Sequence, residues 1–344
     1  MSDKFHGRLL AGEEAALRRS LDIWRGQAVD YERTAAPERP YASRETTLRA
    51  PVTLRAPGTF SGREIRTITL EPYQDEGWWM ERADLDDCLP TRVSARNVWT
   101  TGQIVSNIVL RSGPPQNYVR MVEHLVALRL GLGLDRARVR LDSGDPPLFA
   151  RGSLDLVEAC ENVGLVETGA PARYVTVKER VSIVAPNGAF LILAPPADGH
   201  PRLRLDCAIR FANAIGNQRL RTILQPDEFR SGAYARTNTS AAKKIYCRTL
   251  GRVFADIRHL GYTDENILIA GRRRYYNEPR LMHQGRSLEA VWHRAMLDLL
   301  AALALIEEGR FVGEVISFKA GHALDVKLVT QCYRRDLWTP FVPS

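Results

Sequence analysis

The sequence has few cysteines and no long apolar run, and both absences exclude classes of protein. Its five cysteines are odd in number, widely scattered and without a C-x-x-C pair, which argues against a disulfide framework or a cysteine zinc site. No apolar stretch reaches about 18 residues, so no membrane-spanning helix is expected. Residues 1–25 are polar and mixed in charge, with no secretory or lipidation motif. We therefore expect a cytoplasmic protein with buried, unpaired cysteines.

The net charge of +8 is carried more by arginine than by lysine. Basic runs such as residues 272–274 could touch nucleic acid, but no recognition motif or row of aromatic residues accompanies them. Arginine also binds phosphate oxygens in pairs through its planar guanidinium. The sequence therefore favours a small phosphate-bearing partner such as a sugar nucleotide over nucleic acid.

A chain of 344 residues suggests two domains of ordinary size. Residues 1–44 form an N-terminal extension, with helical spacing over 13–24 and a proline-containing linker over 34–41. Residues 45–168 and 169–337 repeat one order of elements, in which short alternating strands precede two helices with a strand between or after them. Residues 338–344 form a tail. This order predicts an α+β fold with a sheet and helices in each domain.

Three of the seven histidines stand in suggestive phrases. His124 follows Glu123 in a predicted helix over 117–130, and His293 precedes Asp298 in a predicted helix over 287–308. His322 follows a predicted strand over 311–318. Imidazoles and a carboxylate can hold a metal ion, and hydrolysis further needs a base and an acid. The pattern predicts a zinc-dependent hydrolase with its site in the cleft between the domains.

Six phrases resemble, in order, motifs of the UDP-3-O-acyl-N-acetylglucosamine deacetylase family of lipid A biosynthesis. The resemblance runs from about Thr46 to Leu337. Residues 122–125 and 131–135 are similar to the family's V-E-H-L and G-L-G-I-D. The other phrases are 58–62 (G-x-H-S-G), 77–85 (the strand that follows this turn), 215–218 (I-G-R-Q), 248–251 (R-T-F-G) and 318–324 (F-K-S-G-H-A-L).

The resemblance implies a fold of two β-α-α-β domains packed face to face, with zinc in the cleft between them. Members of the family hydrolyse the 2-acetamido group of UDP-3-O-acyl-N-acetylglucosamine and release acetate. Carried over by position, His124, His293 and Asp298 would bind zinc, Glu123 would be the general base, and His322 would be the general acid. We expect a monomer that acts on a sugar nucleotide.

Four further site residues follow from the same resemblance. The R-T-F-G phrase implies that Thr249 stabilises the oxyanion, and its neighbour Leu250 is expected to contact the substrate. Lys319 lies three residues before His322 and could meet a substrate phosphate. Arg294 stands where the family has a lysine after the second histidine, and it is predicted to bind substrate.

One spacing departs from the family. The family's second histidine and its aspartate are four residues apart, so they share a helix face. Here His293 and Asp298 are five apart, which turns the aspartate by roughly 140°. A one-residue π-bulge could restore their convergence, and we favour this account. Alternatively, Glu289 is the third ligand, Leu297 occupies the aspartate position, or Arg294 occupies the histidine position.

Three other departures bear on activity. Phe60 stands where the family turn has histidine, and Arg151 replaces an acid. The aspartate that supports the general-acid histidine falls on Ala301 or Ala302, which predicts weaker support for His322. Two alternatives therefore stay open: a catalytically silent relative that binds a sugar nucleotide or a protein partner, and a deacetylase for a different N-acetyl sugar.

Overall fold

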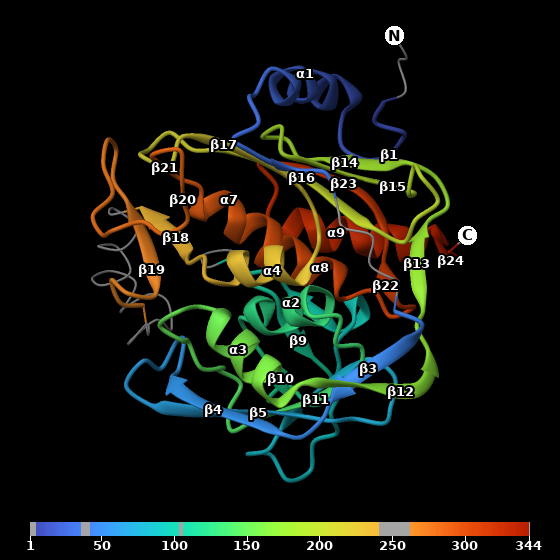
Figure 1. The fold of residues 1–344 in the computed structure, drawn as a ribbon, viewed down its shortest axis with the longest axis vertical. Coiled ribbons are helices and arrows are strands. Elements are labelled where there is room, and N and C mark those ends of the chain that lie inside the picture. Colours follow the sequence, from blue (N-terminus) through green and yellow to red (C-terminus); the bar gives the residue numbers. More distant parts are fainter. Residues whose placement is uncertain (1–4, 36–41, 103–105, 241–261, 344) are drawn as a thin grey trace.

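The computed structural model describes residues 5–35, 42–102, 106–240 and 262–343. Helices and sheets are both abundant in these ranges, which agrees with the predicted α+β class. Figure 1 shows two large sheets as outer layers with most of the helices between them. No helix in the described ranges is long and apolar enough to cross a membrane. The division into two β-α-α-β domains with the predicted boundaries stays a prediction.

The first large sheet has five strands in the order β4-β5-β11-β6-β7. Burial alternates along β5, where Ile68 and Leu70 are fully buried, because one face of the sheet packs on helices and the other meets solvent. The strands are β4 Val52–Pro57, β5 Ile65–Glu71, β11 Ala137–Leu141, β6 Trp78–Arg82 and β7 Thr91–Arg92. The helices of this half are α2 Glu123–Gly131 and α3 Leu154–Val163.

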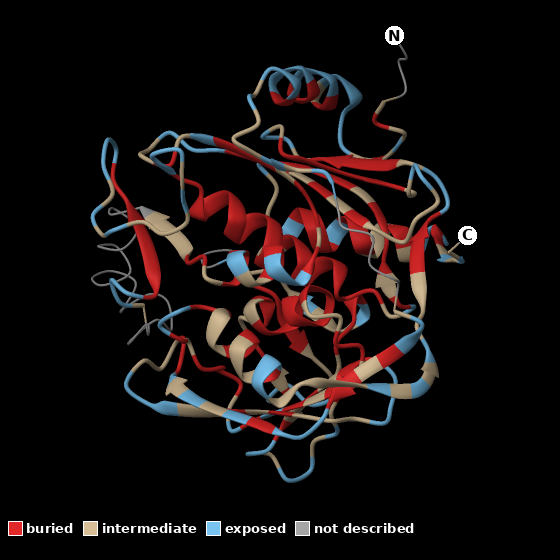
Figure 2. Cartoon of the chain, in the orientation of Figure 1, coloured by how far each residue is buried: buried red, intermediate tan, exposed pale blue. Residues whose placement is uncertain are grey.

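The second large sheet has seven strands in the order β1-β14-β15-β23-β16-β17-β2. Every residue of β14 and β15 is buried (Figure 2), because helices cover both faces of the sheet at these strands. The strands are β1 Arg8–Ala11, β14 Val181–Val184, β15 Phe190–Ala194, β23 Gly313–Phe318, β16 Leu203–Arg210, β17 Asn217–Ile223 and β2 Tyr31–Arg33.

Smaller elements complete the described chain. Two short sheets have three strands each: β8 Val98–Thr100 with β9 Val109–Arg111 and β10 Tyr118–Val119, and β13 Tyr174–Val177 with β22 Arg310–Phe311 and β24 Trp338–Phe341. The other short sheets are pairs: β3 Arg44–Leu48 with β12 Leu165–Pro171, β18 Thr237–Ser240 with β19 Ile267–Ala270, and β20 Met282–His283 with β21 Arg286–Ser287. The remaining helices are α1 Glu14–Arg25, η1 Ala95–Asn97, α4 Pro226–Ala233, α7 Glu289–His293, η2 Arg294–Leu299, α8 Leu300–Leu303 and α9 His322–Arg334.

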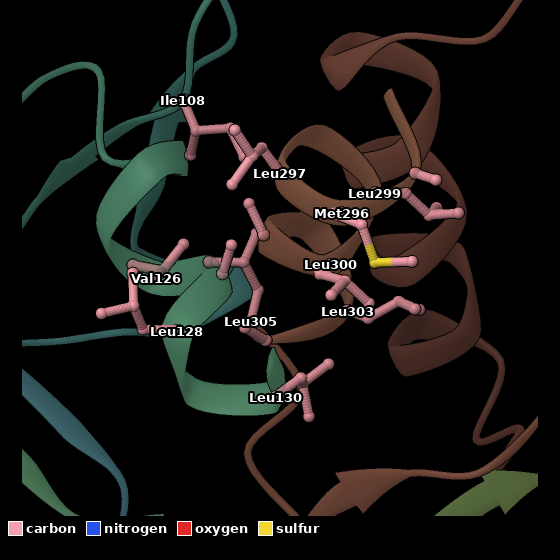
Figure 3. Close-up of a cluster of buried hydrophobic side chains, with 14 of the residues drawn as sticks. Ile108, Val126, Leu128, Leu130, Met296, Leu297, Leu299, Leu300, Leu303 and Leu305 are labelled. Atoms are coloured by element: carbon pink, nitrogen blue, oxygen red, sulfur yellow. The ribbon is translucent and has the colours of Figure 1, made fainter. Parts of the chain in front are cut away.

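The middle of the molecule is a hydrophobic core shared by helices of both halves. α2 packs against η2 and α8, and Figure 3 draws buried side chains of these helices, among them Leu130 of α2 and Leu297 and Leu300 of the facing run. Leu297, Leu300 and their labelled neighbours in Figure 3 are fully or almost fully buried. Burying a leucine stabilises a fold by roughly 1.5–3 kcal/mol relative to leaving it exposed. This core therefore fixes α2 against the helical run that contains His293.

The predicted helix over 287–308 contains a π-helix, as one account of the spacing proposed. The run begins as α7, widens into the π-helix η2 after His293, and returns to α-helix at Leu300. A π-turn closes hydrogen bonds between residues five apart. His293 and Asp298 therefore lie on the same side of the run despite their spacing of five.

Other elements differ from the sequence predictions in identifiable ways. The helix predicted from 117 begins at Glu123, because residues 118–119 pair as β10 and Met121 has a left-handed φ of 54°. Residues 210–239, which have no clear sequence pattern, contain all of β17 and α4 and most of β18. The helix predicted over 240–260 falls almost wholly outside the described residues. The extension over 1–44 contributes α1 near its predicted bounds and also two strands of the second large sheet.

Candidate active site

Two histidines from different halves of the chain meet at the centre of the molecule. His124 lies in the first turn of α2, and His293 is the last residue of α7. Their Nε2 atoms are 3.1 Å apart. The hydroxyl of Thr237, at the start of β18, lies 2.9 Å from Nε2 of His293 and 3.3 Å from Nε2 of His124. Three donor atoms thus converge on one point.

The protein environment keeps the imidazole of His124 neutral. Burial, with a smaller contribution from the neighbouring His293, lowers the pKa of His124 to about 3. A neutral imidazole presents a nitrogen lone pair, which is the form that binds metal ions. The backbone carbonyl of His124 accepts a hydrogen bond of 2.9 Å from the Ser153 hydroxyl, which ties this turn of α2 to the start of α3.

The π-helix brings Asp298 to two histidines. Its Oδ1 lies 3.3 Å from Nδ1 of His293 and 3.4 Å from Nε2 of His322. Burial opposes ionisation, but the two imidazoles outweigh it and hold the pKa of Asp298 well below its usual range. A charged carboxylate on Nδ1 favours the tautomer of His293 that leaves Nε2 free as a ligand.

Glu123 and His322 face each other beside this group. Nε2 of His322, the first residue of α9, is 3.4 Å from Oε1 of Glu123. The same oxygen accepts a hydrogen bond from the backbone N–H of Ile108. The other oxygen, Oε2, is buried without a hydrogen-bond partner. Burial raises the pKa of Glu123, and a carboxylate with a raised pKa is a stronger base.

Of the three predicted metal ligands, His124 and His293 bring their Nε2 atoms together, whereas Asp298 does not join them. The two Nε2 atoms of His124 and His293 converge as a pair of imidazole ligands would. Oδ1 of Asp298 is buried and has no hydrogen-bond partner, but it lies on the Nδ1 side of His293. Among the described residues, no group of three histidine, cysteine or acidic side chains has the geometry to hold a metal. The imidazole pair is therefore assembled, and Asp298 is the nearest candidate for a carboxylate ligand.

Glu289, the alternative third ligand, lies elsewhere. It is fully buried, and its carboxylate accepts bonds of 2.7 and 3.0 Å from the Arg236 guanidinium and 2.7 Å from the Arg280 backbone N–H. Leu297 packs in the hydrophobic cluster beside Ile108 (Figure 3). These two accounts of the spacing are excluded by the positions of the side chains.

Arg294 is buried in a structural ion pair. Its guanidinium is 4% exposed and donates two hydrogen bonds of 2.6 Å to Asp325, with Ser317 as a further partner. It therefore has little surface to offer a substrate, and it does not replace His293 beside His124.

Removing Asp325 is expected to destabilise the fold strongly. Asp325→Ala leaves the Arg294 guanidinium buried without its partner, and breaking a buried pair in this way costs about 3–5 kcal/mol. The free energy of unfolding from urea denaturation measures the loss. Glu179→Ala is the control, because Glu179 pairs with Arg8 at the surface and exposed pairs contribute only about 0–1 kcal/mol. Equal losses in the two variants would contradict a buried structural role for the pair.

The described part of the chain contains one other predicted substrate contact, Lys319. Lys319 is exposed at the end of β23, and its ammonium donates to the Asn187 carbonyl at 2.9 Å. Thr249 and Leu250 lie outside the described residues, so their roles stay predictions. Phe60 lies under the Arg120 guanidinium at 3.8 Å from ring centroid to Cζ, and Arg151 pairs at the surface with Asp155.

Thr237 is a site residue that the sequence predictions missed. Arg236 and Thr237 repeat the first two letters of the family's R-T-F-G phrase, so a signal was present. The phrase at 248–251 matches three of the four letters, because it also ends in glycine. Only the fold shows that Thr237 lies beside both imidazoles.

A small cavity adjoins His124, and a larger cavity lies beyond it. The smaller is largely apolar and is lined by His124, Thr237, Met121 and Leu125 among others. The larger has a volume of about 680 Å³ and lies between β4 and the segment that precedes β19. Leu148 and Phe149 line both cavities. The site thus has neighbouring apolar space on the side of Phe149.

Comparison with known proteins agrees with the resemblance seen in the motifs. The family model described as "LpxC: UDP-3-O-acyl N-acetylglycosamine deacetylase" matches residues 45–334. The UDP-3-O-acyl-N-acetylglucosamine deacetylase of Xylella fastidiosa (strain Temecula1 / ATCC 700964) is 29% identical over 290 residues, covering 83% of this chain and 89% of the relative. Those of Geobacter sp. (strain M21) and Hahella chejuensis (strain KCTC 2396) are 28% and 25% identical, cover 86% of this chain, and are covered over 91% and 92% of their own lengths. The chain therefore belongs to the UDP-3-O-acyl N-acetylglycosamine deacetylase (LpxC) family.

Proposed function

We propose that this protein is a zinc-dependent deacetylase that hydrolyses the acetamide of a UDP-linked, acylated N-acetylglucosamine. One observation carries the proposal: the imidazoles of His124 and His293, from separate halves of the chain, have Nε2 atoms 3.1 Å apart beside a buried Glu–His pair. The names of the relatives supply the substrate class.

His124 and His293 would hold the metal through Nε2, and Asp298 is proposed as the carboxylate ligand. A bound zinc ion supplies Lewis acidity toward the acetamide carbonyl and lowers the pKa of water. Asp298 does not complete this ligand set in the structure, because its Oδ1 lies on the Nδ1 side of His293.

The proton transfers fall to Glu123 and His322. Oε2 of Glu123 is buried and unpartnered, so it can accept a proton from the attacking water. His322 donates a proton to the departing amine, because an amine leaves readily only when it is protonated. The Thr237 hydroxyl can donate a hydrogen bond to the oxygen that becomes negative during attack on the carbonyl.

The surroundings suit an acylated sugar nucleotide. The larger cavity, with Leu54, Leu148 and Phe149 in its lining, offers apolar surface to an acyl chain. Lys319 is exposed and close in sequence to His322, so it remains our proposed phosphate contact. We propose no substrate contact for Arg294, because Asp325 and Ser317 occupy its guanidinium.

Metal analysis and acetate release together test this function. Protein reconstituted with zinc is expected to bind about one ion per chain through two imidazoles and a carboxylate, and to release acetate from a UDP-linked acyl-N-acetylglucosamine. Elemental analysis and an acetate assay give the two results. His293→Ala is the matched variant, and it should lose both. Zinc binding without acetate release from this substrate would point to a different N-acetyl sugar.

One observation favours the second candidate, a catalytically silent relative that binds a sugar nucleotide. Among the described residues no complete three-ligand group is assembled, and Ala301 and Ala302 are buried where the family has a supporting aspartate. Absence of zinc after reconstitution, with retained binding of the UDP-sugar in calorimetry, would establish that alternative.

A further inference from the structure

The N-terminal residues 8–33 supply both edges of the second large sheet. β1 pairs in parallel with β14 at one edge, and β2 pairs in parallel with β17 at the other. Between them, α1 crosses the outer face of the sheet (Figure 1). These residues precede the segment that the family model matches, 45–334. Chain outside that segment thus closes two edges and covers one face of the sheet.

α1 packs directly behind the strand that leads to His322. Leu17, Leu21 and Trp24 of this helix form a buried cluster with Phe190 and Phe318. Phe318 is the last residue of β23, four residues before His322 begins α9. The extension therefore supports the second large sheet at the strand from which this site residue follows.

Arg219 fixes the path of the chain from α1 to β2. Its guanidinium, on β17, donates 3.0 Å hydrogen bonds to the carbonyls of Trp24 and Gln27, and two 2.8 Å bonds to Asp206. The backbone N–H of Arg219 donates to Asp30 at 2.8 Å. The side chain is only 4% exposed. This turn is consequently held at both of its ends by one buried arginine.

β2 then contacts two helices: α7, which carries His293, and α4, which precedes Thr237. The ring of Tyr31 lies 5.1 Å from that of Trp292, between centroids, and Trp292 immediately precedes His293. The Tyr31 hydroxyl donates to Glu228 of α4 at 2.9 Å. Arg33 also donates to Glu228, at 2.6 Å.

A hydrogen bond to Asp30 holds the segment that precedes α7. Asp30 accepts a 2.6 Å hydrogen bond from Arg286 of β21, which ends two residues before α7 begins. α4, for its part, ends four residues before Thr237. Residues 30–33 therefore contact three elements that lead into the site: β21, α7 and α4.

We propose that residues 30–33 form a positioning strap, in which the ring of Tyr31 on Trp292 holds the helical turn that carries His293. The strap acts through Trp292 and α4, so Tyr31 is a positioning residue and does not touch substrate. Small displacements of site groups by distant changes can reduce turnover by about 10²-fold. The role in turnover rests on the proposed deacetylase function, whereas the mechanical role does not.

Tyr31→Ala and Tyr31→Phe test the strap in the full-length protein. Tyr31→Ala removes the ring and is expected to lower kcat about 10-fold or more with KM within about twofold, and to weaken zinc binding about 10-fold. Amide hydrogen exchange of the metal-free protein should rise in residues 289–299. Tyr31→Phe keeps the ring and should restore all three values to near wild type. Arg8→Ala, at the other edge of the sheet, is the control and should change none of them.

The outcomes separate the strap from general destabilisation and from the proposed function. A fall in melting temperature for Tyr31→Ala with unchanged kcat, zinc affinity and exchange over 289–299 would overturn the strap. Equal losses in Tyr31→Phe and Tyr31→Ala would also overturn it. If the wild type neither binds zinc nor releases acetate, the proposed function fails, while the exchange comparison between the two variants still decides the strap.

Discussion

Glu123→Gln is expected to reduce kcat by about 10²–10⁴-fold, the range in which a positioned general base contributes. Glutamine keeps the shape of the side chain and can still accept the hydrogen bond from Ile108, but it cannot take a proton from water. The buried, unpartnered Oε2 is the atom whose basicity is lost. Steady-state acetate release measures the effect, and elemental analysis should find zinc content unchanged.

A substitution at the neighbouring residue, His124, distinguishes loss of the general base from loss of the metal. His124→Ala should remove zinc along with activity, because it deletes a proposed ligand, whereas Glu123→Gln should separate the two. The control is Glu161→Gln, a surface carboxylate paired with Arg230, which should leave turnover within about twofold of wild type because surface substitutions are usually near neutral. Wild-type turnover in Glu123→Gln would remove this residue as the base.

Thr237→Val is expected to lower kcat by about 10²–10³-fold, as does loss of one donor to a developing oxyanion. Valine matches threonine in shape but lacks the hydroxyl that lies 2.9 Å from His293. Thr237→Ser keeps that hydroxyl and should retain most of the activity, with KM little changed in both variants. Kinetics with saturating substrate distinguish the two.

Thr249→Val decides between the two threonines of the Arg-Thr phrases. Sequence resemblance assigns the oxyanion role to Thr249, whereas the fold brings Thr237 to the imidazole pair. A larger loss of kcat in Thr249→Val than in Thr237→Val would return the role to Thr249. A loss confined to Thr237→Val would assign it to the residue at the start of β18.

The site could be predicted from the sequence where its residues lie in short, continuous motifs. Glu123 and His124 share one helical turn, and His322 follows a strand, so the elements that carry them could be predicted from the sequence. The five-residue spacing of His293 and Asp298 left four accounts open, and the favoured one, a π-bulge that restores a shared face, agrees with the π-helix η2. These predictions rest on local geometry, which a sequence encodes strongly.

Features that depend on distant backbone contacts were not predictable. The strands of the extension join the second large sheet through backbone hydrogen bonds, which any sequence can make, so nothing in residues 8–11 or 31–33 indicates their partners. Thr237 gains its place from the packing of α4 and β18. The side of His293 on which Asp298 lies is likewise a matter of packing, because helical periodicity fixes only the face and not the ring orientation.

The wide turn at residues 294–299 has a consequence for the length of the polypeptide. Compared with the family's four-residue spacing between histidine and aspartate, this chain holds one more residue inside a helix whose flanks are both buried. Because the expansion is confined to a single turn, Val291 before it and Leu300 after it still face the interior. An extra amino acid can therefore be carried through the centre of the protein without rotating the packed surfaces on either side.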